Sequence, residues 1–267
     1  MRADQLLVER GLAASRSQAV RLIAGGLRWR DAGMSTADWR VVVKNRDDIP
    51  EGAELELSDA AEARYVSRGG LKLEGALDAT GIAVRGRHCL DVGQSTGGFT
   101  DCLLQRGAAH VVGIDVGHGQ LHERIRADER VTAIEKVNAR ALTVDDFVDV
   151  DRADFDLVVG DLSFISQTLV LPAVVPFLAA DGDLLILVKP QFELQPGQVG
   201  KGGIVRDDAM YPIVEQRLRE ACAASGLRVV RWLDSPIEGG DGNREFFIHA
   251  VRADGHAGAA HATTAEL

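Results

Sequence analysis

The sequence has 267 residues, of which 46% are hydrophobic and 26% are charged, a balance typical of a globular protein with one medium domain and one small domain. No apolar run approaches the roughly 20 residues of a membrane-spanning helix, and Asp4 stands where a signal peptide would have a cationic lead, so we expect a cytoplasmic protein. The three cysteines, Cys89, Cys102 and Cys222, are too widely spaced for a disulfide framework or a metal site, and we expect them to pack in the interior.

The formal net charge of −10 is unfavourable for binding nucleic acid, because contacts to phosphate dominate that affinity. The charge is unevenly distributed, however. Residues 1–46 contain nine Lys and Arg residues but only four Asp and Glu residues. A basic N-terminal segment joined to an acidic remainder of the chain indicates that only the N-terminal segment contacts a polyanion.

Two short amphipathic helices are predicted at the start of the chain. The first covers residues 2–12 and stops at Gly11, and the second begins with a capping box formed by Ser15 and Gln18 and ends at two glycines. Three extended segments then follow, at residues 27–30, 39–43 and 54–57. This order predicts a compact α+β domain over residues 1–58, close to the smallest size at which domains fold unaided.

This first segment resembles a known RNA-binding domain. Arg2-x-Asp4, Leu7-Val8-x-x-Gly11 and Ser15-Arg16-x-x-Ala19-x-x-Leu22-Ile23-x-x-Gly26 are similar to the small domain named after ribosomal small-subunit protein four. Arg and Lys side chains of that family meet RNA phosphates, which implies an RNA-binding role for Arg2, Arg16, Arg21, Arg28 and Arg30. The alternative is that these arginines only solvate a helix face.

Residues 59–67 form a polar linker, and residues 68–252 are predicted to form the main domain. A helix is expected from Arg68 to Ala79, stopped by Gly81. Strands and helices then alternate, and the predicted strands are Cys89–Val92, Val111–Ile114, Val131–Ile134, Leu157–Val159, Leu184–Val188, Leu227–Leu233 and Phe246–Val251. Alternation of this kind predicts an α/β fold with a doubly wound, largely parallel sheet. The last two strands are separated by turn residues and should pair as a hairpin at the edge, with one strand antiparallel.

The first strand of the main domain runs into a glycine turn, Asp91-Val92-Gly93-Gln94-Ser95-Thr96-Gly97-Gly98-Phe99. Ser95 occupies the position of the second glycine of a dinucleotide fingerprint, and no lysine follows Gly98 as a phosphate loop requires. The remaining pattern, D-x-G-x-x-x-G-G, is the usual first motif of S-adenosylmethionine methyltransferases. Asp115 ends the next strand and suits the ribose hydroxyls of such a cofactor. The alternative is a glycine turn of some other α/β domain.

The cofactor-binding set that we predict from this motif and the strand ends is Asp91, Gly93, Ser95, Thr96, Gly97, Gly98, Phe99, Asp115, Asn138 and Asp161. Asn138 is expected near the adenine, although an Asn after a short strand is more often a turn residue.

Four charged residues lie at element ends on the carboxyl side of the predicted sheet. Asp161 follows one strand, Lys189 ends another, Lys72 opens the first helix and Glu245 begins the last strand. A lysine at the end of a buried strand is seldom there for solubility, although it can also extend to the rim and solvate its charge there.

The same four positions match the Lys-Asp-Lys-Glu tetrad of FtsJ-like ribose methyltransferases. With the first domain included, the chain resembles the haemolysin A, or TlyA-type, rRNA methyltransferases up to about Val251, and this implies a Rossmann-like, seven-stranded methyltransferase domain. The matching motifs include Val66-Ser67-Arg68-Gly69-Gly70-x-Lys72, Asp161-Leu162-Ser163-Phe164-Ile165-Ser166 and Lys189-Pro190-Gln191-Phe192-Glu193. The resemblance implies methyl transfer from S-adenosylmethionine to the 2′-hydroxyl of a cytidine in ribosomal RNA.

The implied roles follow ordinary chemistry. A ribose hydroxyl is a poor nucleophile at neutral pH, so a base within hydrogen-bond reach helps the displacement. Lys189 is the candidate base and Lys72 the neighbouring cation, because a lysine acts as a base only where burial or a second cation disfavours its protonated form. Asp161 and Glu245 would orient the two lysines.

Two glycine-rich or small-residue segments remain. The loop at residues 196–203 lacks the spacing of a phosphate loop, and we expect a mobile loop over the RNA entrance, or a plain linker. The tail at residues 253–267 is predicted to be disordered. His249, His256 and His261 are expected at the surface.

Two other functions compete with this interpretation. The name haemolysin raises the alternative that the protein acts on membranes. The second helix is short, so it gives little support for membrane insertion. A non-catalytic RNA-binding protein with a relic fold is the other, and the intact tetrad argues against it. The sequence leaves open which nucleotide and ribosomal subunit are modified, and the oligomeric state.

Overall fold

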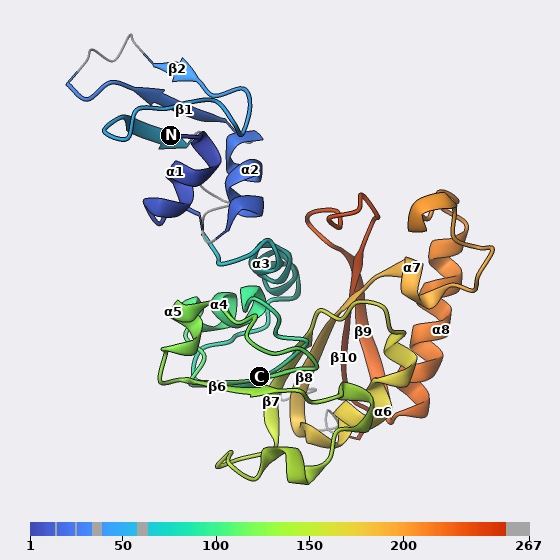
Figure 1. Cartoon of the computed structure of the whole chain (residues 1–267). Helices are drawn as coiled ribbons and strands as arrows, with labels where there is room; N and C mark the ends of the chain where they lie inside the picture. Colours follow the sequence, from blue (N-terminus) through green and yellow to red (C-terminus); the bar gives the residue numbers. More distant parts are fainter. Residues whose placement is uncertain (14, 25, 34–38, 58–63, 255–267) are drawn as a thin grey trace, which may run out of the picture.

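A computed structural model describes residues 1–13, 15–24, 26–33, 39–57 and 64–254, without the side chains of Ser17, Arg21 and Ala24 (Figure 1). Most of the predicted linker and nearly all of the predicted tail, with His256 and His261, lie outside these residues.

The first 57 residues form two helices packed on a small antiparallel sheet. The elements are α1 (Ala3–Glu9), α2 (Arg16–Ala24), β1 (Leu27–Arg30), β2 (Arg40–Val41) and β3 (Glu54–Leu57). β1 lies between β2 and β3. Leu27 and the partly buried Trp29 face the helices, where they pack with Leu7 and Leu22. This segment therefore has a core of its own, as the predicted α+β order requires.

The predicted capping box at the start of α2 contributes to a contact between the two parts of the chain. Ser15 Oγ accepts a hydrogen bond from the backbone N–H of Gln18 at 3.2 Å, as predicted. The side-chain Nε2 of Gln18 donates to the carbonyl of Tyr65 at 3.0 Å. Ser15 thus caps α2 through the N–H of Gln18, while the buried side chain of Gln18 holds the first segment against the start of the main domain.

The main domain is built on a sheet with the strand order β6-β5-β4-β7-β8-β10-β9. The strands are β4 (His88–Val92), β5 (His110–Asp115), β6 (Val131–Glu135), β7 (Phe155–Gly160), β8 (Leu178–Val188), β9 (Leu227–Asp234) and β10 (Phe246–Arg252). Strands β4 to β8 are parallel, and β10 is antiparallel to both of its neighbours. The predicted seven-stranded α/β fold and its terminal hairpin are confirmed.

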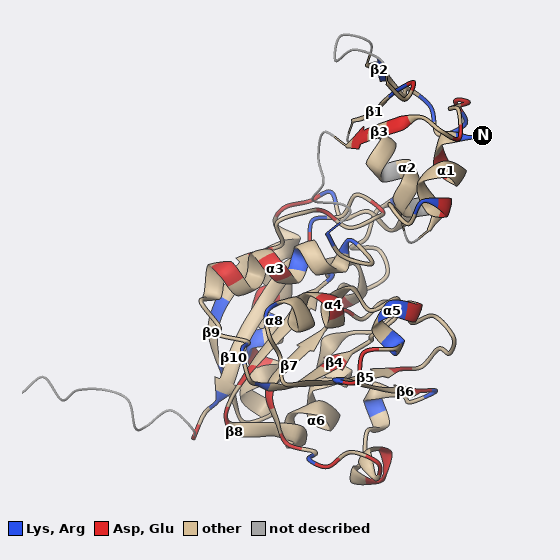
Figure 2. Cartoon of the chain, turned by 90° about the vertical axis from the view of Figure 1, so that its left-hand side faces the viewer, with Lys and Arg blue, Asp and Glu red and all other residues tan. Residues whose placement is uncertain are grey.

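Helices cover both faces of this sheet (Figures 1 and 2). One face carries α3 (Gly69–Thr80), α4 (Gly98–Gln105) and α5 (Glu123–Arg126), and the other carries α6 (Leu171–Val174) and α8 (Met210–Ala224). The short helix α7 (Pro190–Glu193) follows β8. Turns of 3₁₀ helix occupy Ala139–Ala141, Val144–Phe147, Gln167–Leu169, Val175–Phe177 and Lys201–Gly203. As predicted, α3 ends at Gly81, whose φ of 74° is the left-handed conformation of a helix stop.

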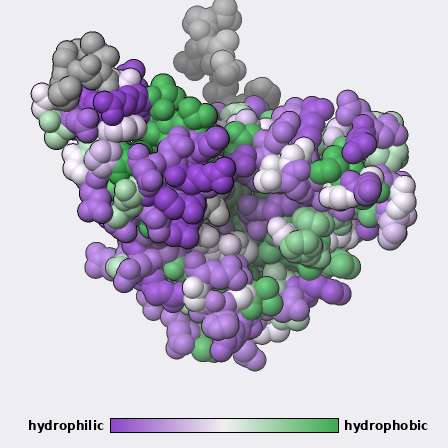
Figure 3. All heavy atoms as spheres, turned by 45° about the horizontal axis from the view of Figure 1, so that its top comes forward, coloured by the Kyte–Doolittle hydropathy of each residue, from purple (hydrophilic) through white to green (hydrophobic). Residues whose placement is uncertain are grey.

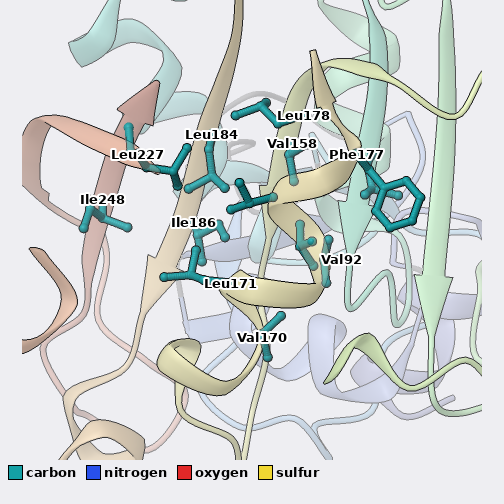
Figure 4. Close-up of a cluster of buried hydrophobic side chains, with 14 of the residues drawn as sticks. Val92, Val158, Val170, Leu171, Phe177, Leu178, Leu184, Ile186, Leu227 and Ile248 are labelled. Carbon is teal, nitrogen blue, oxygen red and sulfur yellow. The ribbon is translucent and has the colours of Figure 1, made fainter. Parts of the chain in front are cut away.

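Branched aliphatic side chains fill the space between the sheet and α6 and α8. Figure 4 shows Val92, Val158, Leu184 and Ile186 from the parallel strands, packed against Leu171 of α6. Because both faces are covered, these strands are apolar almost continuously rather than alternately. Their carboxyl ends are therefore held at one rigid edge.

Strand β8 begins six residues earlier than predicted. The added residues pair with β7 through an irregular register between Phe155 and Leu157, where Leu178 and Asp183 are the partners. This stretch contains acidic residues and a glycine, so it lacks the apolar pattern by which a buried strand is predicted.

The prediction that His249 lies at the surface is wrong. His249 is 7% exposed, because β10 lies between two other strands, and its Nε2 is 2.7 Å from Asp183 Oδ1. The prediction for the cysteines is confirmed: Cys89, Cys102 and Cys222 are free and buried.

Within the described residues, no helix is both long enough and apolar enough to cross a membrane. On the face drawn in Figure 3, hydrophilic residues predominate and apolar residues form small separate groups.

Candidate active site at the carboxyl ends of the parallel strands

The glycine turn between β4 and α4 requires bare backbone. Gly93 has φ of 85°, and a Cβ atom there would lie 2.8 Å from the carbonyl oxygen of Asp161. A Cβ atom on Gly98 would collide with Ser67 Oγ. Gly97, with φ of 96°, precedes α4 as its N-cap residue. The turn is therefore shaped by contacts with two segments distant in sequence as well as by its own torsion angles.

A cavity of about 590 Å³ opens in front of this turn. Eight of the ten predicted cofactor-binding residues line it, and they are Gly93, Ser95, Thr96, Gly98, Phe99, Asp115, Asn138 and Asp161. Lys189 also lines it. Asp91 and Gly97 are not among the lining residues.

Asp91 lies behind the cavity wall and is fully buried. Its Oδ2 accepts a hydrogen bond from Thr100 Oγ1 at 2.7 Å, and its Oδ1 has no partner among the described residues. Burial raises the pKa of Asp91 to about 7. In this structure Asp91 ties the end of β4 to the first turn of α4.

Asp115 faces the cavity and organises the loops around it. Its two carboxylate oxygens accept hydrogen bonds from the backbone N–H groups of Ser95 and Gly117, each at 2.7 Å. Asn138 also lines the cavity, but its Oδ1 caps the following turn by accepting from the N–H of Arg140 at 3.1 Å. That is the turn role that the sequence left open for Asn138.

Sequence reasoning missed several lining residues, among them Ser67, Gln94, Val116, Gln120, Arg140 and Phe164. Ser67 and Phe164 stood inside recognised motifs, so the motifs carried a signal that was not assigned. Val116 and Gln120 stood in a further matching motif, Asp115-Val116-Gly117-x-Gly119-Gln120-Leu121, but periodicity could not assign them a role, because a side chain in an irregular loop shows none.

The four tetrad residues form two ion pairs. Lys72 Nζ lies 2.5 Å from Glu245 Oε2, and Lys189 Nζ lies 2.5 Å from Asp161 Oδ1. Lys189 Nζ also donates to Ser163 Oγ at 2.9 Å. Lys72 and Glu245 are buried, whereas Asp161 and Lys189 face the cavity.

The two pairs belong to one electrostatic cluster. Burial raises the pKa of Glu245, while the charges of Lys72 and Lys189 act in the opposite direction and that of Asp161 raises it further. The cluster therefore joins a residue of α3, the residue before β10 and the residues that follow β7 and β8, and its Asp161–Lys189 half lines the cavity.

Phe164 stands beside this cluster and is 90% exposed. Its backbone has φ of 64°, an unusual value for a bulky residue, and its ring lies 5.0 Å from that of Phe192. An exposed aromatic ring at the rim of a cavity offers a flat surface for a planar group.

The arginines of the first segment are mostly paired with acids. Arg2 donates to Asp4, Arg28 lies 2.7 Å from Glu56, and Arg30 lies 2.5 Å from Glu54. The acids of β3 that take part are red in Figure 2. Arg28 and Arg30 also lie over the ring of Trp39, at 5.3 and 4.7 Å. Arg16 is exposed, and the side chain of Arg21 lies outside the described part.

The glycine-rich segment at residues 196–203 is fixed at its far end by Asn243. Asn243 Nδ2 donates to the carbonyl of Gly203, and its Oδ1 accepts from the N–H of Val205, both at 2.9 Å. Asn243 lies two residues before Glu245, so this segment approaches the tetrad. A role in RNA entry stays a prediction.

Comparison with known proteins gives consistent matches. The FtsJ-like methyltransferase family matches residues 65–252. The 16S/23S rRNA (cytidine-2′-O)-methyltransferase TlyA of Mycobacterium tuberculosis is 45% identical, over 92% of this chain and 88% of its own length. Hemolysin A of Brachyspira hyodysenteriae is 37% identical, over 94% of this chain and 100% of its own. A Streptococcus thermophilus protein that carries the name hemolysin has a solved structure with a TM-score of 0.72 and 39% identity, covering 95% of this chain and 89% of that one.

Proposed function

The chain belongs to the FtsJ-like methyltransferase family, and from this premise we propose that it transfers a methyl group from S-adenosylmethionine to the 2′-hydroxyl of a cytidine in ribosomal RNA. The observation that carries the proposal is the joining of a glycine-lined cavity to a cluster of two Lys–carboxylate pairs. The similar protein from M. tuberculosis bears the name of this reaction. We assign the protein to the cytoplasm, because its proposed substrate is ribosomal RNA.

The residues of the cavity fit the cofactor. Gly93 and Gly98 line the cavity, and because neither carries a side chain a ligand can lie against their backbone. A Cβ atom on either would instead collide with the Asp161 loop or with Ser67 and distort the turn. We assign Ser95 to Phe99 to the methionine part, Asp115 to the ribose and Asn138 to the adenine end, with Val116 beside it. Asp91 and Gly97 support this cradle from behind. When bound, S-adenosylmethionine supplies the methyl group.

Lys189 is the proposed base. Asp161 and Ser163 hold its Nζ at the cavity wall, and in its amine form Nζ would accept the proton of the 2′-hydroxyl. Lys72 supplies the neighbouring positive charge, and Glu245 compensates and orients it. Burial of this second pair excludes water from one side of the reacting group.

We assign RNA recognition to two places. Phe164 is positioned to stack on a base beside Lys189, because its ring is exposed next to Ser163. The basic first segment would contact phosphates through Arg16 and Arg21. Arg2, Arg28 and Arg30 would have to exchange their carboxylate partners for phosphate. This exchange lowers their net contribution to the free energy of RNA binding.

The test is a map of 2′-O-methyl groups. Purified protein, S-adenosylmethionine and unmethylated small and large ribosomal subunits are incubated separately, and modified positions in both RNAs are located. We expect methylation of cytidine ribose in the large subunit, with the small subunit as a second possible substrate. Methylation at a base atom, or none on either RNA, would contradict the proposal. Lysis of erythrocytes by the same preparation without cofactor would instead support membrane activity.

A further inference from the structure

We propose that Glu193, a buried carboxylate outside the tetrad, is a positioning residue that sets Lys189 against Asp161. The inference rests on the methyl transfer proposed above. It concerns how the loop after β7 and the turn after β8 are held in register.

The carboxylate of Glu193 reaches the loop that carries Asp161. Glu193 is the last residue of α7, the short turn of helix that begins directly after Lys189. Its Oε2 accepts from Ser166 Oγ at 2.5 Å, and its Oε1 accepts from the N–H of Gln167 at 2.7 Å. Both carboxylate oxygens are therefore used on two adjacent residues of the neighbouring loop.

The same two residues are also tied to the chain on the other side of Lys189. Gln167 Nε2 donates to the carbonyl of Leu187 at 3.2 Å. Ser166 and Gln167 thus contact the β8–α7 segment both before Lys189, at Leu187, and after it, at Glu193. The lysine lies between the two attachment points, which fixes its backbone relative to the Asp161 loop.

Burial of the Glu193 carboxylate at this position costs desolvation free energy. Glu193 is 2% exposed, and burial raises its pKa. The guanidinium of Arg217 donates to the backbone carbonyl of Glu193, while the carboxylate accepts from a hydroxyl and a backbone N–H. An apolar side chain of this size would fill the space at lower desolvation cost. What the carboxylate adds is directional bonding to the loop.

The loop held in this way contains backbone strain. Phe164 lies between the two fixed ends, with φ of 64°. One end is the N–H of Asp161, which donates to the carbonyl of Val92 at 3.1 Å, and the other is Ser166. A bulky residue keeps such a conformation only when its surroundings fix it. Release of the Ser166 end should therefore let the loop relax and carry Asp161 and Ser163 away from Lys189.

The experiment compares Glu193→Ala with Glu193→Gln on the full chain. We expect Glu193→Ala to lower kcat for RNA methylation by about 10- to 100-fold, the cost of a small misplacement at a reacting group. The KM for RNA should change by less than about 3-fold, because no RNA-facing group is removed. Glu193→Gln should stay within about 3-fold of wild type, since its amide oxygen can accept from Gln167 and its NH₂ can donate to Ser166.

A second readout does not depend on turnover. Amide hydrogen exchange of cofactor-free protein, followed in the peptide covering residues 161–169, should lose protection in Glu193→Ala and keep it in Glu193→Gln. If Glu193→Ala is too unstable to purify, Ser166→Ala removes one of the two bonds and should show a smaller change of the same kind.

The control is Leu227→Ala, which truncates a buried side chain at the start of β9. Leu227 belongs to the hydrophobic cluster between the sheet and helices α6 and α8. This substitution should lower thermal stability without lowering kcat. Unchanged kcat in Glu193→Ala, or equal losses in the Ala and Gln variants, would overturn the positioning role. If wild type itself fails to methylate RNA, that result contradicts the proposed function. The exchange data then still decide whether Glu193 holds the loop through Ser166 and Gln167.

Discussion

Lys189 is the residue on which the proposed chemistry depends most directly. Arginine at this position keeps a positive charge that can pair with Asp161, but it stays protonated and cannot accept a proton. We expect Lys189→Arg to bind S-adenosylmethionine within about 3-fold of wild type and to lose about 100-fold or more in turnover, the usual worth of a general base. Calorimetry measures the first quantity and single-turnover methylation the second.

A matched control for this substitution is Lys136→Arg, which makes the same change at an exposed lysine outside the tetrad and outside the segment at residues 196–203. It should leave turnover unchanged. Near-normal methylation by Lys189→Arg would remove Lys189 from the role of base.

Asp91 should make the free energy of unfolding depend on pH. The unfolded chain releases the Asp91 proton near pH 4, whereas the folded protein holds it up to about pH 7, because the carboxyl is buried. Between these values the folded state binds more protons, so this contribution to stability is present at low pH and is lost as the pH rises toward 7.

Asp91→Asn removes this titration and can keep the bond from Thr100 through its amide oxygen. As the pH rises from 5 to 8, the free energy of unfolding of the variant should therefore increase relative to that of wild type. The expected change is on the order of a few kcal/mol, at about 1.4 kcal/mol for each unit of pKa shift. Denaturant unfolding of the cofactor-free proteins at both pH values measures it. A difference between the two proteins that does not change with pH would show that Asp91 ionises normally.

At the scale of elements, the site depends on how the glycine turn meets the loop after β7. Gly93→Ala adds a methyl group 2.8 Å from the Asp161 carbonyl oxygen and is expected to weaken S-adenosylmethionine binding by at least about 10-fold. Gly86→Ala is the matched control: its φ of 76° imposes comparable backbone strain, but its Cβ atom would have no heavy atom within 4 Å. Both variants should lose some thermal stability, and only Gly93→Ala should lose cofactor affinity. Equal affinities by calorimetry would show that the close approach is not needed.

At the scale of the whole molecule, a basic segment is attached to an acidic catalytic domain through contacts such as Gln18 with Tyr65. If the first segment delivers RNA, Arg16→Ala should weaken RNA binding at all salt concentrations and reduce the slope of log affinity against log salt by about one. Arg152→Ala removes an arginine paired with Asp154 on the main domain and should leave the slope unchanged. Filter binding over a range of salt concentrations measures both. An unchanged slope in Arg16→Ala would indicate that this arginine only solvates its helix.

Sequence by itself determined the order of elements, the glycine turn and the four tetrad residues, because apolar periodicity, glycine positions and motif spacing are local properties of a chain. Tertiary structure alone decided which of these meet. Lys72 pairs with Glu245, 173 positions away, because α3 packs on the face of the sheet that β10 helps to form. The strand order buries His249 and places Glu193 against Ser166. Pairing of Arg28 and Arg30 with the acids of β3 likewise follows from strand register. Neighbours across a sheet, and the burial they impose, are properties of the assembled fold, and no local pattern contains them.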